Sequence, residues 1–185
     1  MKSFEDVISY KFKNRSLLDT ALTHSSYVNE NRKYASEDYQ RLEFLGDSVL
    51  GFLTAEYLYA SGNITEGSMT RMRSELVSEK ALYEVAKSID LGRYIRIGKG
   101  EEHMGGREKP SVLSDIVESV TAAIYLDSGM EAAREFAMRF VLNDVHMASA
   151  EVSDDYKSAL QELVQQDPSN VLSYELVGEE GPDHN

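Results

Sequence analysis

Two carboxylates with helical spacing lie in an apolar stretch of the 185-residue chain. Glu43 and Asp47 are four residues apart, so on an α-helix their side chains share one face. Between Leu42 and Tyr59 the only other charged residue is Glu56, which falls on the opposite side. Like charges at this spacing weaken a helix, and burying them is unfavourable without a positive partner. The pair therefore favours a bound cation, and its hard oxygen ligands favour magnesium, manganese or calcium.

A second pair of acids repeats this arrangement further along the chain. Asp115 and Glu118 are three residues apart and precede the apolar segment 119–126, so they also share a helix face. If the two helices pack side by side, four carboxylates converge, which is stable only with divalent metal or with some groups protonated. Two metal ions about 4 Å apart in such a carboxylate cage can hydrolyse a phosphodiester. The alternative is four ordinary surface acids, but their apolar flanks count against it.

Together with other segments, these acids make the chain resemble the ribonuclease III family over roughly residues 4 to 148. The first acidic segment resembles the family signature and reads Gln40-Arg41-Leu42-Glu43-Phe44-Leu45-Gly46-Asp47-Ser48. Asp115-x-x-Glu118 resembles the second acidic motif of the family. The other segments that resemble it, in chain order, are Tyr10-Lys11-Phe12-Lys13-Asn14, Ala21-Leu22-Thr23-His24-Ser25-Ser26-Tyr27, Gly98-Lys99-Gly100-Glu101, Gly105-Gly106-Arg107 and Tyr125-Leu126-Asp127-Ser128-Gly129.

The resemblance implies a magnesium-dependent endoribonuclease, with manganese as a substitute, that cuts double-stranded RNA. It implies a homodimer, 5′-phosphate and 3′-hydroxyl ends with a short 3′ overhang, and a role in RNA processing, including ribosomal RNA. Its metal ligands would be Glu43, Asp47, Asp115 and Glu118, with Asp47 and Glu118 catalytic. Phe44 would insert into the partner subunit, the alternative being an ordinary core position.

A non-catalytic RNA-binding or ribosome-associated member of the same fold is the second hypothesis. Such members usually lose core acids, and this chain keeps all four. A purely helical interaction protein would leave the acids unexplained. One departure from the family pattern is Gln40, where many bacterial members carry Glu. Gln has no charge and one carbonyl oxygen, so any auxiliary role of this position is in doubt here.

Several other residues could bind RNA or take part in chemistry. His24 is better interpreted as a structural residue than as a general base, and Ser48 as a packing residue or a partner of water or a neighbouring acid. The run Gly98-Lys99 lacks P-loop spacing and the following Ser or Thr, so no nucleotide cofactor is expected. The candidate phosphate contacts, each of which could also be a solvated surface charge, are Arg71, Arg73, Arg96, Lys99, Arg107 and Lys109.

Composition limits the class of protein. The chain is 42% hydrophobic and 28% charged, with no apolar run near 20 residues and no signal-peptide pattern at its start. A soluble cytoplasmic protein without a membrane partner is therefore expected. The absence of cysteine excludes disulfides, thiolate zinc sites and cysteine nucleophiles. The net charge of −13 argues against nucleic acid, but 151–185 holds nine acids and one lysine, or −8, leaving −5 for 1–150.

The elements that must position the acids are helices. Residues 39–60 read as a long helix, apolar nearly all round and therefore central, in which Gly46 and Gly51 are expected to serve close packing. No strand pattern occurs before residue 170, so residues 1–150 are predicted to form an all-α catalytic domain, a helical bundle. Loops are expected at 29–38 and 98–110. The remaining predicted helices are 4–9, 16–23 (capped by Asn14), 65–77 (by Thr65), 78–89 (by Ser78), 111–126 and 130–148.

The segment 151–185 has a different pattern. A helix is predicted at 155–163 and an alternating strand at 172–177, which resemble the opening of a double-stranded-RNA-binding domain. The remaining strands and the second helix of such a domain do not follow. This short α/β fragment is therefore expected to be a truncated or rudimentary module that does not bind RNA on its own.

Overall fold

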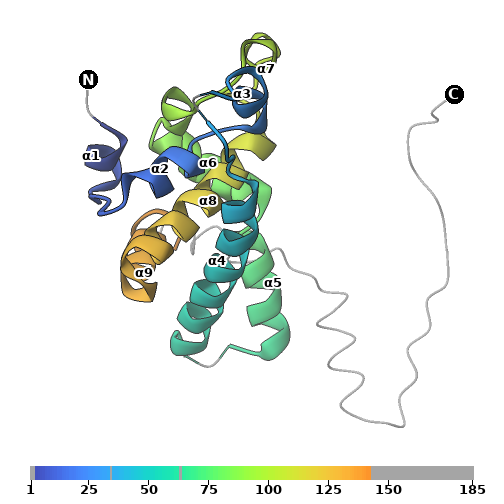
Figure 1. Ribbon diagram of the computed structural model, residues 1–185. Coiled ribbons are helices and arrows are strands. Elements are labelled where there is room, and N and C mark those ends of the chain that lie inside the picture. Colours follow the sequence, from blue (N-terminus) through green and yellow to red (C-terminus); the bar gives the residue numbers. More distant parts are fainter. Residues whose placement is uncertain (1–2, 34, 63, 143–185) are drawn as a thin grey trace, which may run out of the picture. The chain divides into compact units, whose positions relative to one another are not determined.

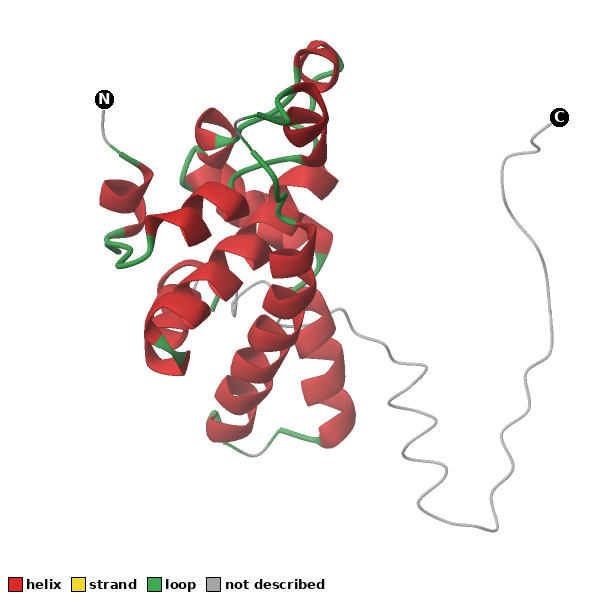
Figure 2. Cartoon of the chain, in the orientation of Figure 1, coloured by secondary structure: helices red, strands yellow, loops and turns green. Residues whose placement is uncertain are grey.

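The computed structural model describes residues 3–33, 35–62 and 64–142, and within these ranges it contains helices and no named strand (Figures 1 and 2). The prediction of an all-α domain is confirmed. The elements are α1 (Phe4–Ile8), α2 (Arg15–Ala21), α3 (Ser25–Glu30), α4 (Gln40–Ala60), α5 (Glu66–Leu76), α6 (Glu79–Ser88), the 3₁₀ helix η1 (Leu91–Tyr94), α7 (Lys99–His103), α8 (Pro110–Ser128) and α9 (Met130–Phe140).

Polar side chains start several of these helices where the sequence predicts. Asn14 Oδ1 accepts from the Ser16 amide, and Thr65 Oγ1 accepts from the Ser68 amide. The Ser78 hydroxyl accepts from the amide of Ala81. Each of these caps satisfies a free amide of the first turn and typically stabilises a helix by about 1 kcal/mol.

Helix α8 is the central element of the domain. It packs against α2, α4, α6 and α9 (Figure 1), and Ile116, Val120 and Ile124 along it are almost completely buried. The predicted long helix at 39–60 is confirmed, but its expected central position holds for one side only, because α4 buries that side against α8 and exposes large side chains on the other. An apolar pattern cannot tell a core helix from one whose apolar face is left uncovered within the chain.

Two predicted loops contain short helices. Helix α3 ends inside the predicted loop 29–38, and α7 lies within the predicted loop 98–110. The start of α7 is capped from a distance, because the Glu30 carboxylate accepts from the amides of Lys99 and Gly100, at 2.9 and 3.3 Å. A cap supplied from 69 residues away leaves no local signal in the sequence. The end of the predicted helix 130–148, and the segment 151–185, lie outside the described residues.

A short bridge fixes the loop that enters α3. Thr23 and Arg96 form an isolated parallel β-bridge, in which the His24 amide donates to the Arg96 carbonyl at 2.9 Å. The Arg96 amide donates to the Leu22 carbonyl at 2.7 Å. The Thr23 carbonyl also accepts from the Tyr39 amide, at 3.0 Å, so this loop is joined to the start of α4.

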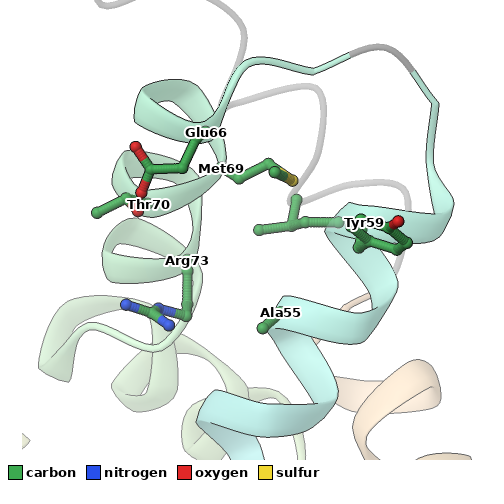
Figure 3. Close-up of a pocket in the computed structure, with 7 residues that line it drawn as sticks. Ala55, Tyr59, Glu66, Met69, Thr70 and Arg73 are labelled. Atoms are coloured by element: carbon green, nitrogen blue, oxygen red, sulfur yellow. Dashed lines mark hydrogen bonds between the residues drawn. The ribbon is translucent and has the colours of Figure 1, made fainter.

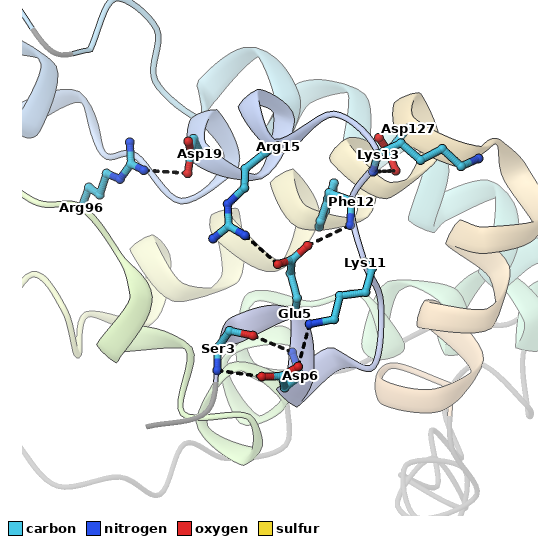
Figure 4. A network of polar contacts seen from close by, with 10 residues as sticks. All are labelled: Ser3, Glu5, Asp6, Lys11, Phe12, Lys13, Arg15, Asp19, Arg96 and Asp127. Carbon is cyan, nitrogen blue, oxygen red and sulfur yellow. Dashed lines mark hydrogen bonds and ion pairs between the residues drawn. The ribbon is translucent and has the colours of Figure 1, made fainter.

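The N-terminal segment is held by two acids, and Figure 4 shows both with some of their donors. Glu5 is only 6% exposed, and its carboxylate accepts from the Phe12 amide and from the Arg15 guanidinium, at 2.9 and 2.7 Å. Burial of this charge is compensated by the cation and the amide.

The second acid is Asp127, near the end of α8. It accepts from the Tyr10 hydroxyl at 2.6 Å and from the amides of Lys13 and Asn14 at 3.0 and 2.7 Å. Burial alone would raise the pKa of Asp127, but these hydrogen bonds lower it below its ordinary value. We call Tyr10, Glu5, Arg15 and Asp127, with the amides they bind, the N-terminal network.

Candidate metal centre at the crossing of two acidic helices

The backbones of helices α4 and α8 come into contact at Gly46. A Cβ atom at Gly46 would lie 2.0 Å from the carbonyl oxygen of Glu118 and 2.4 Å from its carbonyl carbon, so no larger residue fits without separating the two backbones. The expected packing role of Gly46 is confirmed. That of Gly51 is wrong within this chain, because a Cβ there meets nothing within 4 Å.

The crossing gathers the four predicted acids. Glu43 and Asp47 flank Gly46 on α4, while Asp115 and Glu118 come from α8. Burial, and then the charges of Asp47, Asp115 and Glu43, raise the pKa of Glu118 to about 8. Burial, followed by Asp115, Asp38 and Asp47, likewise raises the pKa of Glu43. The structure therefore brings the two pairs close enough to repel one another.

No cation of the described residues neutralises this cluster at close range. Among the described residues, none of the four carboxylates forms an ion pair with a Lys, Arg or His side chain. Burial raises the pKa of Asp115, and the charge of Glu79 adds to this, whereas the Tyr39 hydrogen bond and the more distant His24 and Lys109 act to lower it. Within the described part of the chain, the negative charge of the cluster is therefore not matched by an ion pair.

The Tyr39 contact is one that sequence analysis missed. The Tyr39 hydroxyl donates to Asp115 Oδ2 at 3.0 Å, and burial raises the pKa of this phenol above its ordinary value. A signal was present, because Tyr39 stands four residues before Glu43 and so on the same helix face.

The donor set fits a hard divalent cation. Carboxylate oxygens are the ligands that magnesium and manganese prefer, and bound divalent charge would relieve the repulsion recorded in the pKa of Glu118. As the side chains stand, no three His, Asp or Glu residues in the part of the chain that the structure describes are already arranged as ligands of one ion. Binding would require some of these side chains to reorient, which is open to Asp47, which is exposed, and to Glu43 and Glu118, which are partly exposed.

A groove leads away from the acids between α4 and α5. Asp47 and Ser48 lie at one end of a depression of about 510 Å³ that Arg73 also lines. A second depression, of about 220 Å³, continues along the same helices and shares Arg73 and Ala55 (Figure 3). The arginine therefore stands between the acidic site and a more apolar region lined by Tyr59 and Met69.

Two of the six candidate phosphate contacts are engaged within the fold. Arg96 pairs with Asp19 at 2.6 Å (Figure 4). The Arg107 guanidinium donates to the carbonyls of Gly92 and Ile95, at 3.0 and 2.6 Å, and pairs with Glu102. Arg96 ties the connection between η1 and α8 to α2, and Arg107 ties it to the η1 segment, which makes both poorer candidates for RNA.

The other four candidates have exposed side chains. Arg73 lines the groove beside Asp47, and Lys109 is near enough to act on the pKa of Asp115. Lys99 begins α7, and Arg71 lies on α5, where it has an interaction of its own. Arg73 and Lys109 are therefore the basic residues placed best for a phosphate at the acids.

The remaining candidate residues lie at separate positions in the structure. His24 caps α3, with Nδ1 accepting from the Ser26 amide at 3.2 Å, which confirms its structural role. Ser48 is exposed at the groove, and Gln40 is exposed at the start of α4. Phe44 is 79% exposed, so the alternative of a core position is wrong in this chain.

Comparisons with known proteins relate this chain to a single family. A family model described as ribonuclease-III-like matches residues 14–145. Ribonuclease 3 of Listeria monocytogenes is 41% identical over 185 residues, covering the whole of this chain and 81% of the relative. Ribonuclease 3 of Desulforamulus reducens is 45% identical over 181 residues, covering 96% and 73%. The nuclease domain of ribonuclease III from Campylobacter jejuni has a TM-score of 0.69 at 40% identity, over 75% of this chain and 93% of that one. No helix in the described residues is long and apolar enough to cross a membrane.

Proposed function

The chain belongs to the ribonuclease III family and is an endoribonuclease, and we propose that it cuts double-stranded RNA with magnesium held at the α4–α8 crossing. Manganese would substitute for magnesium. The products would carry 5′-phosphate and 3′-hydroxyl ends with a short 3′ overhang. A cytoplasmic role in RNA processing, including ribosomal RNA, belongs to the same proposal.

The observation that carries this proposal is the uncompensated charge at the crossing. Glu43, Asp47, Asp115 and Glu118 would hold the metal, with Asp47 and Glu118 nearest the reaction. When bound, divalent ions would stabilise charge on the attacked phosphate and lower the pKa of a water nucleophile. Without metal, the pKa of Glu118 is raised to about 8, so its carboxyl group is protonated at lower pH. Binding of a metal ion by this group would therefore displace that proton.

The RNA would be recognised mainly by shape. An A-form duplex presents phosphates and 2′-hydroxyls rather than distinctive base edges, so one or two cations at the groove can position it without reading sequence. Arg73 and Lys109 are the residues proposed for this role. The net charge of −13 limits nonspecific affinity for RNA. The salt dependence of binding scales with the number of phosphates contacted, so these few contacts should make it shallow.

A homodimer is the assembly proposed. Phe44, Phe52 and Tyr59 follow one another at spacings of eight and seven residues on one side of α4, and are 79%, 53% and 79% exposed. A row of large exposed apolar side chains is typical of an interaction surface. The related Campylobacter jejuni structure concerns flexibility in a region involved in dimer formation. We expect Phe44→Glu to convert a dimer into a monomer in sedimentation velocity.

The test is cleavage of a labelled RNA duplex with magnesium and with a chelator, beside a single strand of the same sequence. We expect duplex cleavage in magnesium only, with the single strand left largely intact. End-group analysis of the fragments checks the proposed 5′-phosphates. Binding of the duplex without cleavage in magnesium or in manganese would favour the non-catalytic alternative and contradict the proposal.

A further inference from the structure

Tyr39 connects both acidic helices. It is 5% exposed at the start of α4, where its carbonyl accepts from the Glu43 amide at 2.9 Å. Its hydroxyl crosses to α8 and donates to Asp115 Oδ2 at 3.0 Å. One residue therefore sets the backbone of a proposed ligand on α4 and the side chain of a proposed ligand on α8.

The phenol ring is itself held in place. Its centroid lies 5.8 Å from that of the His24 ring, at an interplanar angle of 45°. His24 caps α3 and is fixed by the bridge to Arg96, and the Tyr39 amide donates to the Thr23 carbonyl. The hydroxyl thus has a fixed position relative to both acidic helices.

We propose that Tyr39 is a positioning residue that orients the Asp115 carboxylate for the divalent ion. The inference rests on the proposed function, since it concerns the same site. A phenol has one hydrogen to donate, so the bond to Oδ2 fixes the plane of the carboxylate and leaves Oδ1 free to bind a cation. Outer partners of this kind typically change metal affinity by about 10- to 100-fold.

The chain supplies a matched control for a purely structural role. Tyr10 donates to Asp127 at 2.6 Å, which is also a tyrosine–aspartate bond between distant segments, but it belongs to the N-terminal network. Tyr10→Phe and Tyr39→Phe each remove a single hydroxyl and keep the ring. If both bonds served only the fold, neither variant would bind metal more weakly than wild type at a temperature where it is folded.

The experiment is calorimetric titration of manganese into the RNA-free full chain, for wild type and both variants, with the melting temperature of each. We expect Tyr39→Phe to bind manganese about 10-fold more weakly, while Tyr10→Phe binds as wild type. In the cleavage assay, Tyr39→Phe should need about 10-fold more magnesium for half-maximal rate. Its rate at saturating magnesium should approach that of wild type, because the ligand itself remains.

The outcomes separate the two proposals. Equal manganese affinity of Tyr39→Phe and wild type, with an unchanged magnesium requirement, would overturn the positioning role and leave the proposed function standing. An equal loss of affinity in Tyr10→Phe would also overturn it, because the effect would then be general to the fold. A wild-type chain that binds no manganese would overturn the proposed function and this inference together.

Discussion

The N-terminal network and the α4–α8 crossing both contain partly buried carboxylates, but they treat the charge in opposite ways. In the network, Glu5 faces an arginine and an amide, and Asp127 accepts hydrogen bonds from a tyrosine hydroxyl, a serine hydroxyl and two amides. At the crossing, the neighbours of Glu118 that shift its pKa are three further acids. The pKa of Asp127 is accordingly lowered, while that of Glu118 is raised to about 8.

The contrast separates acids that stabilise the fold from acids that we propose bind a metal ion. A carboxylate with donors in the native state stabilises folding, because its charged form is favoured there. A carboxylate surrounded by other acids destabilises the metal-free protein, and its charged form is stabilised only when a cation binds. Strongly perturbed pKa values at a groove are typical of functional sites for this reason.

The largest expected effect comes from removing an acid at the crossing. Glu118→Gln and Asp47→Asn keep the shape of the side chain and remove its charge, so cleavage of duplex RNA should fall by about 100-fold or more, several kcal/mol of transition-state stabilisation. Single-turnover cleavage in magnesium measures this. The melting temperature should be unchanged or higher, since a repulsive charge is gone. A variant that cuts at the wild-type rate would show that its acid is not a ligand.

The next effect concerns the contact that joins the two acidic helices. In Gly46→Ala the new methyl group meets the Glu118 carbonyl, so α4 and α8 must separate. We expect a loss of about 1–3 kcal/mol in the free energy of unfolding, together with weaker manganese binding. Urea unfolding and calorimetry measure the two losses. Full stability in Gly46→Ala would show that the helices are not in contact at this point.

A substitution in the N-terminal network should lower stability and leave cleavage unchanged. Asp127→Asn weakens the hydrogen bonds from Tyr10 and from the Lys13 and Asn14 amides, so we expect a loss of about 1 kcal/mol in the free energy of unfolding, allowing for solvent exposure. Cleavage at a temperature where the variant is folded should match wild type. A large loss of cleavage with unchanged stability would erase the distinction between the two regions.

The pH dependence of stability should carry the signature of the crossing. The native pKa of Glu118 is about 8 and its ordinary value is 4.5, so the native state holds more protons than the unfolded state between these values. The contribution of Glu118 to stability is therefore fully present below pH 4.5 and is lost as pH rises through about 8. Thermal melts of the metal-free protein should show this decline, and Glu118→Gln should flatten it. An identical profile for Glu118→Gln and wild type would contradict the assigned pKa.

The smallest effect is expected at the other glycine of α4. A Cβ at Gly51 meets nothing within 4 Å, so Gly51→Ala should stabilise the helix by about 0.5–1 kcal/mol. A chemical denaturation curve measures the gain. A loss of stability that depends on protein concentration would instead place Gly51 against a second copy of the chain.

Much of this arrangement could be predicted from sequence because its signals are local. Helical spacing placed Glu43 with Asp47 and Asp115 with Glu118, and polar caps such as Thr65 and Ser78 marked helix starts. Family resemblance predicted that the two pairs would meet. Neither kind of signal depends on knowing how distant segments pack.

The parts that were missed depend on contacts across the fold. Helix α7 begins on the carboxylate of Glu30, and the guanidinium of Arg107 is taken up by carbonyls of the η1 segment. From the sequence, residues 98–110 are predicted to form a loop and Arg107 to be available for a phosphate. The sequence does not show which distant residues contact them. Gly46 and Gly51 look alike in sequence for the same reason, and only the position of α8 distinguishes them.

Manganese titration of the wild-type chain and of Glu118→Gln, by calorimetry at pH 8 without RNA, tests the central claim most directly. The account predicts saturable binding to wild type, with release of protons, and binding at least about 10-fold weaker in Glu118→Gln. Equal binding by the two proteins, or no binding by wild type, would contradict the assignment of the four acids as a metal site.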